Sequence, residues 1–466
     1  MNNRETDIRS QEKDKFDGQS VEGQQGTTSA EAAPQQEKKK PRRRTAQVKP
    51  EDKHVDETAI HKLTDYHNLP EGAHYVTRNG KIDIHYFEYI EYLPAKVVRH
   101  IYEVARVADG DTIVSSLPDE VKEKAAAKGC PFDARLMAFI LCEKYAYHSS
   151  INTIKKKLRD MGAIFSKTTL NHYFHAGTDA LMGCFDETYH TEVLKSVYLM
   201  IDETCELVAV EDEETASIKY KKKYLWAFFD KAKKLVHYIF EKGSRGMSVV
   251  ENYLQGWQGS ISTDGYVAYR AFSDKHPDIL HIGCWVHARR LFIESLVSDR
   301  KNSLPMIEDC AEMFGIEYNC KLQNMTDEER KRERRKKSRP ILARMLIRAI
   351  RLSKNAVVMA NATMAKAINY LLNQWGNLRN FILDGRVEIS NNLVEQRMKT
   401  IKLDMKNCQN IGSEAAAKRH AFMHSLIESC SLNEIQPVEY LTNLFGRYKT
   451  LKDEEKVALL PCYYKK

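Results

Sequence analysis

The pattern of polar and apolar positions first separates an N-terminal part from the rest of the chain. Residues 1–49 contain one aromatic residue, Phe16, among many Gln, Glu, Ser, Lys and Gly. Such a segment buries too little apolar surface to offset its ordering entropy, so we predict a disordered tail. It ends in the basic run "KKKPRRR", which fits phosphate contacts or a solvating tail equally well. Over residues 50–128, partial alternation predicts a small α+β module.

Residues 129–190 show helical periodicity. The stretches "DARLMAFILCEKYAY" and "SSINTIKKKLRDMG" predict two helices, with Ser150 as N-cap and Gly162 as C-cap of the second. A third helix is expected to start at Ser166 and to run to about Ala176. The last two helices have helix-turn-helix spacing, and a helical bundle without a DNA role is the alternative. In the DNA-binding interpretation, the third helix presents Lys167, Thr168 and Asn171.

From about residue 194 the period changes to that of strands. The order is strand, strand, strand, helix, strand, helix, strand, helix, with a hairpin in "KYLWAFFDKAKKLVHYIF". This order predicts an α/β core in which the first strands pair antiparallel and the later ones add in parallel. We place the core at residues 191–295 and 386–412. A helical insertion over 296–385 interrupts it, and a helical region over 413–466 follows.

Two stretches of the insertion carry specific expectations. "RKRERRKKSR", residues 330–339, has eight basic residues against one acidic and predicts a solvated helix face. "AVVMANATMAKAINYLLNQW" predicts one buried amphipathic helix. After a turn at Asp384 and Gly385, Asn391 or Asn392 can cap the next helix.

Composition narrows the class of protein. A length of 466 residues predicts two to four domains, and the net charge of +8 permits a nucleic-acid partner without requiring one. The ten cysteines are scattered and form no C-x-x-C pair, which is typical of a reduced intracellular chain. The N-terminus has no signal-peptide pattern, and no run of about 18 apolar residues is present. We therefore expect a soluble, cytoplasmic protein with no membrane partner.

Three carboxylates stand where chemistry could occur. Asp202 follows "VYLMI" and Asp264 follows "SIST", so both are predicted at the C-terminal edge of a strand. Glu395 lies in the first turn or so of the helix after "SNN". Singly, each has a structural explanation as a turn residue, a cap or a favourable charge at a helix N-terminus. Together they can hold two Mg²⁺ (or Mn²⁺) ions, which prefer oxygen ligands and clamp the attacking and leaving oxygens of phosphoryl transfer.

Several motifs occur in a characteristic order over residues 194–450. They are "IDET", "GSRG", "GSISTDGYVAYR", "GCWVHARR", "AINYLLNQWGNLRNFILDGRVEISNNLVEQRMKTIK", "KN" at 406–407 and "SLIESCSLNEIQPVEYL". In these motifs the chain resembles the transposase of the insertion-sequence-66 family of bacteria, a DDE-type enzyme with a ribonuclease H-like fold. The resemblance implies the triad Asp202, Asp264 and Glu395. It also implies binding of terminal inverted repeats, Mg²⁺-dependent cleavage and strand transfer, a homo-oligomer on DNA, accessory element-encoded proteins and association with the nucleoid.

The residues around the triad have expected roles as well. Cys284 and His287 form a C-x-x-H pair, which alone is too small for a closed zinc site, so we favour a structural or substrate-positioning role. Asn391 and Asn392 are expected to fix the start of the Glu395 helix. Gly265 is expected to leave room beside Asp264, with Tyr266 and Tyr269 packed under the site. The expected phosphate contacts are Arg245, Lys399, Lys402 and Lys406.

The chain also departs from the family pattern. The family usually has a cysteine-rich zinc module N-terminal to the core, but residues 60–130 contain only Cys130, so we predict no zinc. Thr400 stands where the family usually has Pro, and Met405 where it has Arg. Neither change removes a carboxylate, so an active enzyme is expected. The alternatives are a ribonuclease H-like nuclease without strand joining and a catalytically silent DNA-binding regulator.

Overall fold

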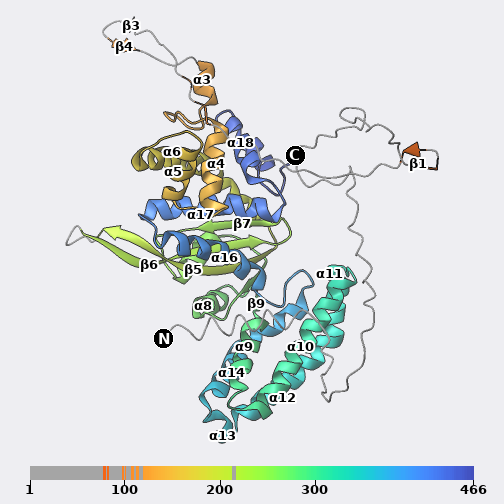
Figure 1. Cartoon of the computed structure of the whole chain (residues 1–466). Helices are drawn as coiled ribbons and strands as arrows, with labels where there is room; N and C mark the ends of the chain where they lie inside the picture. The colour runs from red at the N-terminus through yellow and green to blue at the C-terminus, as the bar shows by residue number, and fades with distance from the viewer. Residues whose placement is uncertain are drawn as a thin grey trace, which may run out of the picture. The chain divides into compact units, whose positions relative to one another are not determined.

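The structure is a computed structural model, shown in Figure 1. It describes residues 77–79, 81–82, 97–98, 100, 107–109, 112–114, 119–211 and 217–465. The predicted tail 1–49 and most of the predicted 50–128 module therefore lie outside the described residues. Two short antiparallel pairs are described in that module: β1 (Thr77–Arg78) with β2 (Lys81–Ile82), and β3 (Val107–Asp109) with β4 (Thr112–Val114). The chain divides into units at 1–93 and 94–466, and the second unit holds α3 (Asp119–Lys124), the central sheet and its covering helices.

A five-stranded mixed sheet forms the centre of this second unit. Its strands are β5 (Tyr198–Glu211), β6 (Ile218–Asp230), β7 (Leu235–Ile239), β8 (Ser260–Thr263) and β9 (Leu280–Gly283), in the spatial order β7-β6-β5-β8-β9. The first three strands pair antiparallel, and β8 and β9 add in parallel. Helices α7 (Met247–Tyr253) and α8 (Val267–Lys275) make the parallel crossovers. The predicted α/β order and strand directions are thus confirmed.

Strand β5 is longer than its apolar run indicates. The prediction that Asp202 ends the strand is wrong, because Asp202 is the fifth of 14 strand residues and pairs with Ala227 of β6. The parallel pairing of β5 with β8, however, covers only Tyr198 to Met200. Beyond that point β5 continues as an antiparallel ribbon with β6. Asp202 therefore lies two residues past the point where the pairing of β5 with β8 ends.

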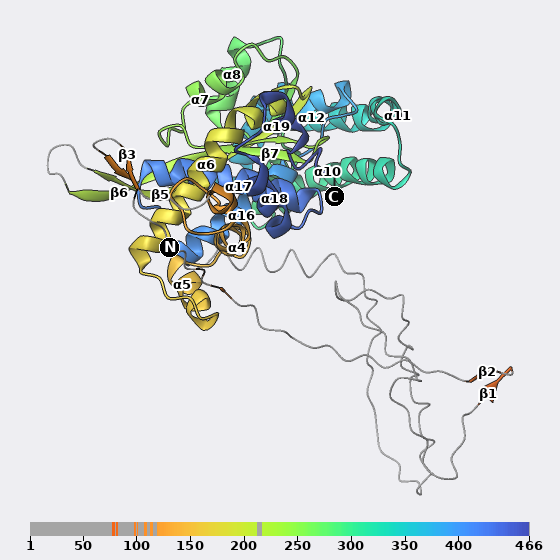
Figure 2. The same ribbon diagram turned by 90° about the horizontal axis from the view of Figure 1, so that it is seen from above.

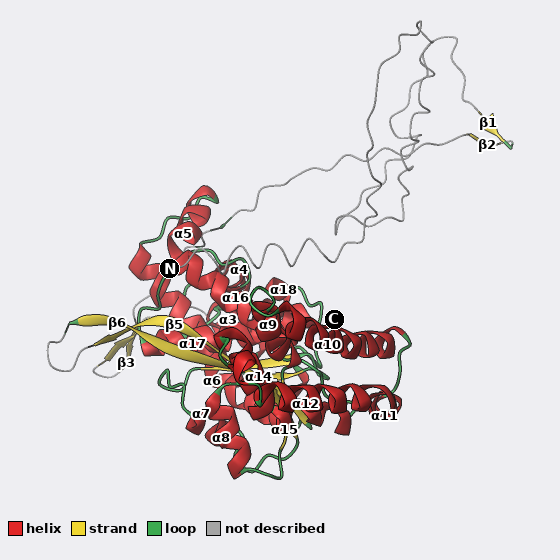
Figure 3. Cartoon of the chain, turned by 90° about the horizontal axis from the view of Figure 1, so that it is seen from below, coloured by secondary structure: helices red, strands yellow, loops and turns green. Residues whose placement is uncertain are grey.

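Both faces of the sheet are covered by helices (Figures 2 and 3). Because side chains alternate along a strand, Leu199 and Ile201 of β5 enter one core, and Tyr198 and Met200 enter the other. The first core includes residues of α4 (Ala134–Tyr145), α5 (Ile151–Asp160), α6 (Lys167–Leu194), α7, α8, α17 (Glu414–Leu432) and α18 (Pro437–Arg447). The second includes residues of α9 (Trp285–Ser295), α16 (Asn392–Cys408) and the helical insertion.

The region predicted to resemble a helix-turn-helix is helical, with the expected caps. The hydroxyl of Ser150 accepts from Thr153 N, and that of Ser166 accepts from Thr169 N. Gly162 follows α5 with φ +87°, the left-handed conformation that glycine tolerates best. The expected end of the third helix near Ala176 is wrong, since α6 continues to Leu194. Its second half is stabilised by packing of Leu181, Phe185, Tyr189 and Val193 in the core.

The insertion between β9 and α16 is almost wholly helical, as predicted. After α9 it comprises α10 (Arg300–Leu322), α11 (Asp327–Glu333), η1 (Arg334–Ser338), α12 (Arg339–Ser353), α13 (Ala356–Met359), α14 (Ala362–Asn373), α15 (Trp375–Arg379) and η2 (Asn380–Leu383). Figure 1 shows α10, α12 and α14 side by side on one side of the sheet. The stretch predicted as one amphipathic helix is two, because the Asn361 side chain accepts from Met364 N and starts α14 anew.

The basic run of the insertion is not simply a solvated face. Arg335, Lys336 and Lys337 are exposed, but Arg334 is fully buried. Its guanidinium pairs with Glu317 of α10 and donates to the carbonyls of Phe381, Asp384 and Val387. The solvated interpretation is therefore wrong for Arg334, since a tertiary acceptor set surrounds it.

The C-terminal region contains α17, α18 and α19 (Asp453–Ala458). Its first helix, α17, packs against β7, the edge strand of the sheet. The hydroxyls of Ser429 and Ser425 on α17 accept from Val236 N and Tyr238 N of β7. An edge strand presents unpaired amides that invite association with other chains. Here α17 covers them. None of the helices over the described ranges is both long and apolar enough to cross a membrane.

Candidate active site

Asp202 and Glu203 lie on opposite faces of β5, because neighbouring strand residues alternate. The pKa of Asp202 is raised well above its usual value, first by burial and then by the negative charges of Glu203, Glu395 and Asp264. Asp202 and Asp264 each lie two residues past the paired Met200 and Ser262 of the neighbouring strands β5 and β8. The charge of Glu395 also acts on Asp202, so the three carboxylates predicted from the sequence lie in one region.

Asp264 follows β8 directly and forms the turn into α8. Its Oδ1 accepts from Tyr266 N at 2.8 Å, as in an Asx turn, while Oδ2 accepts no hydrogen bond from the residues that the structure describes. Gly265 does not leave open space, contrary to expectation. A Cβ there would lie 2.5 Å from the hydroxyl of Tyr370 on α14, so the glycine permits the tyrosine to approach Asp264. Tyr370 was not anticipated from the sequence.

The helix α16 carries Glu395 one turn from its start. Asn391 occupies the N-cap position as predicted, but its side chain makes no capping bond. Instead, its Nδ2 donates to the carbonyl of Ile201 at 2.9 Å, and its backbone N–H donates to the sulfur of Cys284 at 3.2 Å. Asn391 therefore ties the start of α16 to the strand of Asp202 and to the turn between β9 and α9. Asn392 is exposed.

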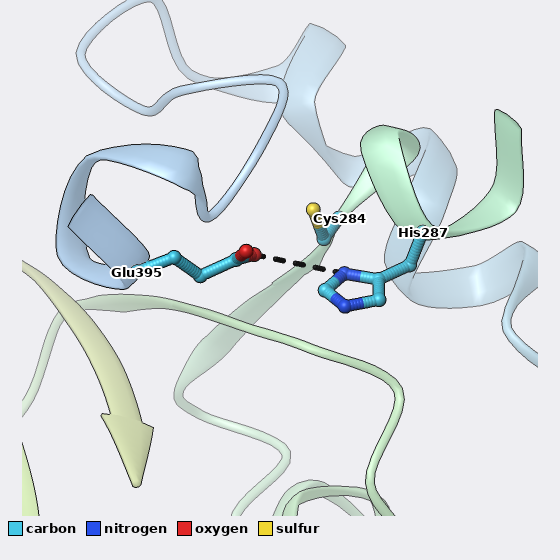
Figure 4. A group of neighbouring side chains, drawn as sticks. All are labelled: Cys284, His287 and Glu395. Carbon is cyan, nitrogen blue, oxygen red and sulfur yellow. Dashed lines mark ion pairs between the residues drawn. The ribbon is translucent and has the colours of Figure 1, made fainter. Parts of the chain in front are cut away.

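The C-x-x-H pair lies beside Glu395 (Figure 4). Nδ1 of His287 is 3.8 Å from Oε1 of Glu395, and both atoms are buried without a hydrogen-bond partner in the described chain. With the sulfur of Cys284, these ligand atoms all lie within 4.8 Å of one another. The sequence favoured a structural or substrate-positioning role for this pair, and the fold adds Glu395 as a third potential ligand. Burial raises the pKa of the Cys284 thiol to about 11, so the thiol is protonated near neutral pH.

Arg245 is held by a partner that sequence reasoning missed. Its Nη2 lies 2.7 Å from Oε1 of the buried Glu203, and its guanidinium stacks 3.9 Å from the ring centre of Tyr266. The hydroxyl of Tyr269 donates to the other Glu203 oxygen at 2.7 Å. Tyr266 and Tyr269 thus position Arg245 and Glu203, on the face of β5 opposite to Asp202. Glu203 could have been found from "IDET", since adjacent acids on a strand serve opposite faces.

The predicted DNA contacts fall into two groups. Lys399, Lys402 and Lys406 are exposed along α16, and none forms an ion pair with the described residues. Lys167 and Thr168 are exposed at the start of α6, in the layer on the other face of the sheet. Asn171 is half-buried and lines a cavity that residues of α16 also line. The structure therefore places the first group on the helix of Glu395 and the second on α6.

The donor set fits divalent cations that prefer oxygen. Asp202, Asp264 and Glu395 concentrate negative charge, and a buried oxygen of Glu395 has no donor among the described groups. The three do not form a cluster in which all ligand atoms lie within 4.8 Å.

Comparison with known proteins gives relatives and a family. The uncharacterized protein y4hP of Sinorhizobium fredii is 26% identical over 387 residues, which cover 75% of this chain and 68% of y4hP. The uncharacterized protein y4jD of the same organism is 30% identical over 219 residues, 46% of this chain and 42% of y4jD. The matched part thus spans less than half of y4jD. A family model described as "Transposase IS66 family" matches residues 129–419. This chain therefore belongs to the IS66 family of transposases.

Proposed function

We propose that the protein is a transposase that binds the terminal inverted repeats of an insertion sequence, cleaves DNA and transfers the freed strand. The observation that carries this proposal is the placement of Asp202 and Asp264 two residues past the paired Met200 and Ser262 of neighbouring strands. The start of the helix that carries Glu395 is tied to the same strand, because Asn391 donates to the carbonyl of Ile201. Membership of the IS66 family supports it. The sheet order β7-β6-β5-β8-β9, with an acid on the central strand, supports a ribonuclease H-like core.

Asp202, Asp264 and Glu395 would hold two Mg²⁺ or Mn²⁺ ions. When bound, such ions lower the pKa of the attacking water or 3′-hydroxyl and stabilise the leaving oxygen. The protein itself must keep the three carboxylates in fixed positions relative to one another. Asn391 does so for Glu395 by anchoring α16 to the strand of Asp202, and the neighbouring imidazole of His287 limits where the Glu395 carboxylate can move.

DNA would contact three parts of the chain. Arg245 presents a guanidinium whose direction is set by Glu203 and Tyr266, so it offers a preorganised contact near the scissile bond. The lysines on α16 form an exposed row that adds salt-dependent affinity. The helices α5 and α6 would read the element ends in the manner of a helix-turn-helix. Synapsis of two ends would require at least two copies of the chain on DNA.

The test uses conservative variants that remove charge but keep shape. Asp202→Asn, Asp264→Asn and Glu395→Gln should each abolish Mg²⁺-dependent cleavage of DNA that carries the element ends. Each should leave binding in a mobility-shift assay unchanged, because the lost charge serves the reacting phosphate. Asp274→Asn, an exposed acid on α8, is the matched control and should cleave normally.

Two outcomes would contradict the assignment. One is normal cleavage by any triad variant. The other is loss of DNA binding by a variant whose circular dichroism shows an intact fold. Joined products on a gel distinguish a transposase from a nuclease without strand joining, and Mg²⁺-dependent nicking distinguishes both from a silent regulator.

A further inference from the structure

A second cluster of metal-ligating side chains lies away from the carboxylate triad. Asp404 comes from the last third of α16, and His420 and His424 come from successive turns of α17. Spacing of four residues puts the two imidazoles on one face of the helix. All three side chains are buried, and their ligand atoms lie within 4.8 Å of one another.

Two distances within this cluster are close to the edge of a coordination tetrahedron. Oδ2 of Asp404 is 3.1 Å from Nε2 of His424 and 3.7 Å from Nδ1 of His420. Zinc bound to nitrogen and oxygen at about 2.1 Å in tetrahedral geometry places neighbouring ligand atoms about 3.4 Å apart. The observed separations bracket that value, and the imidazole of His420 is too far from Asp404 for a hydrogen bond to explain its place.

The groups around the cluster behave as outer partners of metal ligands. Nδ1 of His148 is 2.9 Å from the second oxygen of Asp404. On the far side of the His420 ring, Nε2 is 3.5 Å from Oε1 of Glu206 on β5. Glu206 is 2% exposed, and neither of its oxygens has a hydrogen-bond partner in the described structure. A buried carboxylate without a donor is costly, and carboxylates behind metal-bound imidazoles are common.

We propose that Asp404, His420 and His424 form a binding site for a transition-metal ion of the zinc class. Oδ2 of Asp404, Nδ1 of His420 and Nε2 of His424 are the ligands. A cavity of about 330 Å³ is lined by Asp404 and His420, so a water molecule can complete the coordination. The sequence-based expectation of no zinc rested on cysteine spacing, and none of these ligands is a cysteine.

The site would join the predicted DNA-binding region to the helix that carries Glu395. Lys144 of α4 lies 3.1 Å from Oδ2 of Asp404, and His148 follows α4 closely. Asp404 is itself on α16 with Glu395. This metal site is separate from the proposed ions at the triad, so its existence does not depend on the proposed function.

Replacement of Lys144 offers a test in which the affinity for metal should rise, whereas replacement of a ligand should lower it. Its ammonium group shares Oδ2 of Asp404 with the ion and repels it. The alternative is a network without metal, in which Lys144 pairs with Asp404 and the imidazoles of His148 and His424 hydrogen-bond to it. Lys144→Met should strengthen metal binding about tenfold or more if the metal site is real. A network without metal has no affinity to gain.

The experiment measures metal directly on the full-length chain. Protein stripped with a chelator is titrated with Zn²⁺ and then with Co²⁺, and metal content and the visible absorption of tetrahedral Co²⁺ are recorded. The titration is made in excess Mg²⁺, which occupies the proposed triad sites, and the tightest-binding ion is followed. One such ion per chain should bind to the wild type, and this ion should be lost in His420→Asn and His424→Asn. His175→Asn removes a cavity-lining histidine outside the cluster and is the matched control.

Each result decides the proposal. It is supported if the bound ion is lost in both histidine variants, retained in the His175 control and bound more tightly by Lys144→Met. It is overturned if folded wild-type protein binds no Zn²⁺ or Co²⁺, or if both histidine variants keep the ion. It is also overturned if the ion disappears in Cys284→Ser with His287→Asn, because the metal then sits beside Glu395.

Discussion

Replacement of the buried arginine of the insertion tests the packing argument most directly. Arg334 has no exposed surface and donates through all three of its guanidinium nitrogens. In Arg334→Met, Oε1 of Glu317 and the carbonyls of Phe381, Asp384 and Val387 each lose a donor. The aliphatic part of methionine fills a comparable volume, so the loss concerns hydrogen bonds and charge rather than a cavity.

The magnitude depends on the contacts that remain. Breaking a buried pair by removing one partner costs about 3–5 kcal/mol. Glu317 keeps a second partner, because Nη2 of Arg330 lies 2.6 Å from its Oε2, and this retained pair favours the lower end. We therefore expect Arg334→Met to lower the free energy of unfolding by about 3 kcal/mol. Arg334→Lys keeps the charge but cannot reach every acceptor, so a loss of about 1–2 kcal/mol is expected.

The assay is urea unfolding followed by circular dichroism, with midpoint and slope fitted separately. Arg335→Met is the matched control, because the neighbouring side chain is exposed and has no ion-pair partner among the described residues. It should change the free energy of unfolding by less than about 0.5 kcal/mol. Equal effects of the Arg334 and Arg335 variants would refute the claim that Arg334 is a buried structural cation.

Two further expectations concern stability and the site. Burial alone would raise the pKa of Glu388, but Arg330 and Lys231 outweigh it and lower the pKa to about 2. The resulting stability is full above the unfolded pKa of about 4.5 and disappears as pH falls toward 2, amounting to up to about 3 kcal/mol. Glu388→Gln should flatten the acid limb of a thermal-unfolding series, and an unchanged limb would contradict this sign. Gly265→Ala should slow DNA cleavage with binding retained, because the added Cβ meets Tyr370. Gly183→Ala, with open space around it, should not, and equal activity of the two variants would count against the close approach.

Thr400 and Met405, which depart from the family pattern, lie in different surroundings. Thr400 of α16 uses its hydroxyl, which donates to Glu428 of α17 at 3.1 Å. Arg397, one turn earlier, pairs with the same carboxylate at 2.6 Å. Thr400 therefore helps to join the two helices. Met405 is half-buried and lines the cavity beside Asp404.

Much of the core followed from local signals. Apolar alternation and the turn in "DKAKK" were enough for β6 and β7, since a hairpin depends on neighbouring residues. The serine caps of α5 and α6 followed for the same reason, because a cap bonds three residues along the chain. Ordered motifs drew attention to the carboxylates. Pairing with β6, rather than the apolar run, determined how far β5 continues past Asp202.

The sequence by itself therefore predicted the order and type of the core elements and singled out three acids as candidates, because periodicity, caps and motifs are short-range properties. The tertiary structure alone decided which distant groups meet. Glu203 reaches Arg245, and Tyr370 closes over Gly265. Asp404 joins two histidines of the next helix. The same applies to Arg334, whose acceptors lie 17 to 53 positions away along the chain, so no local pattern could distinguish it from its solvated neighbours.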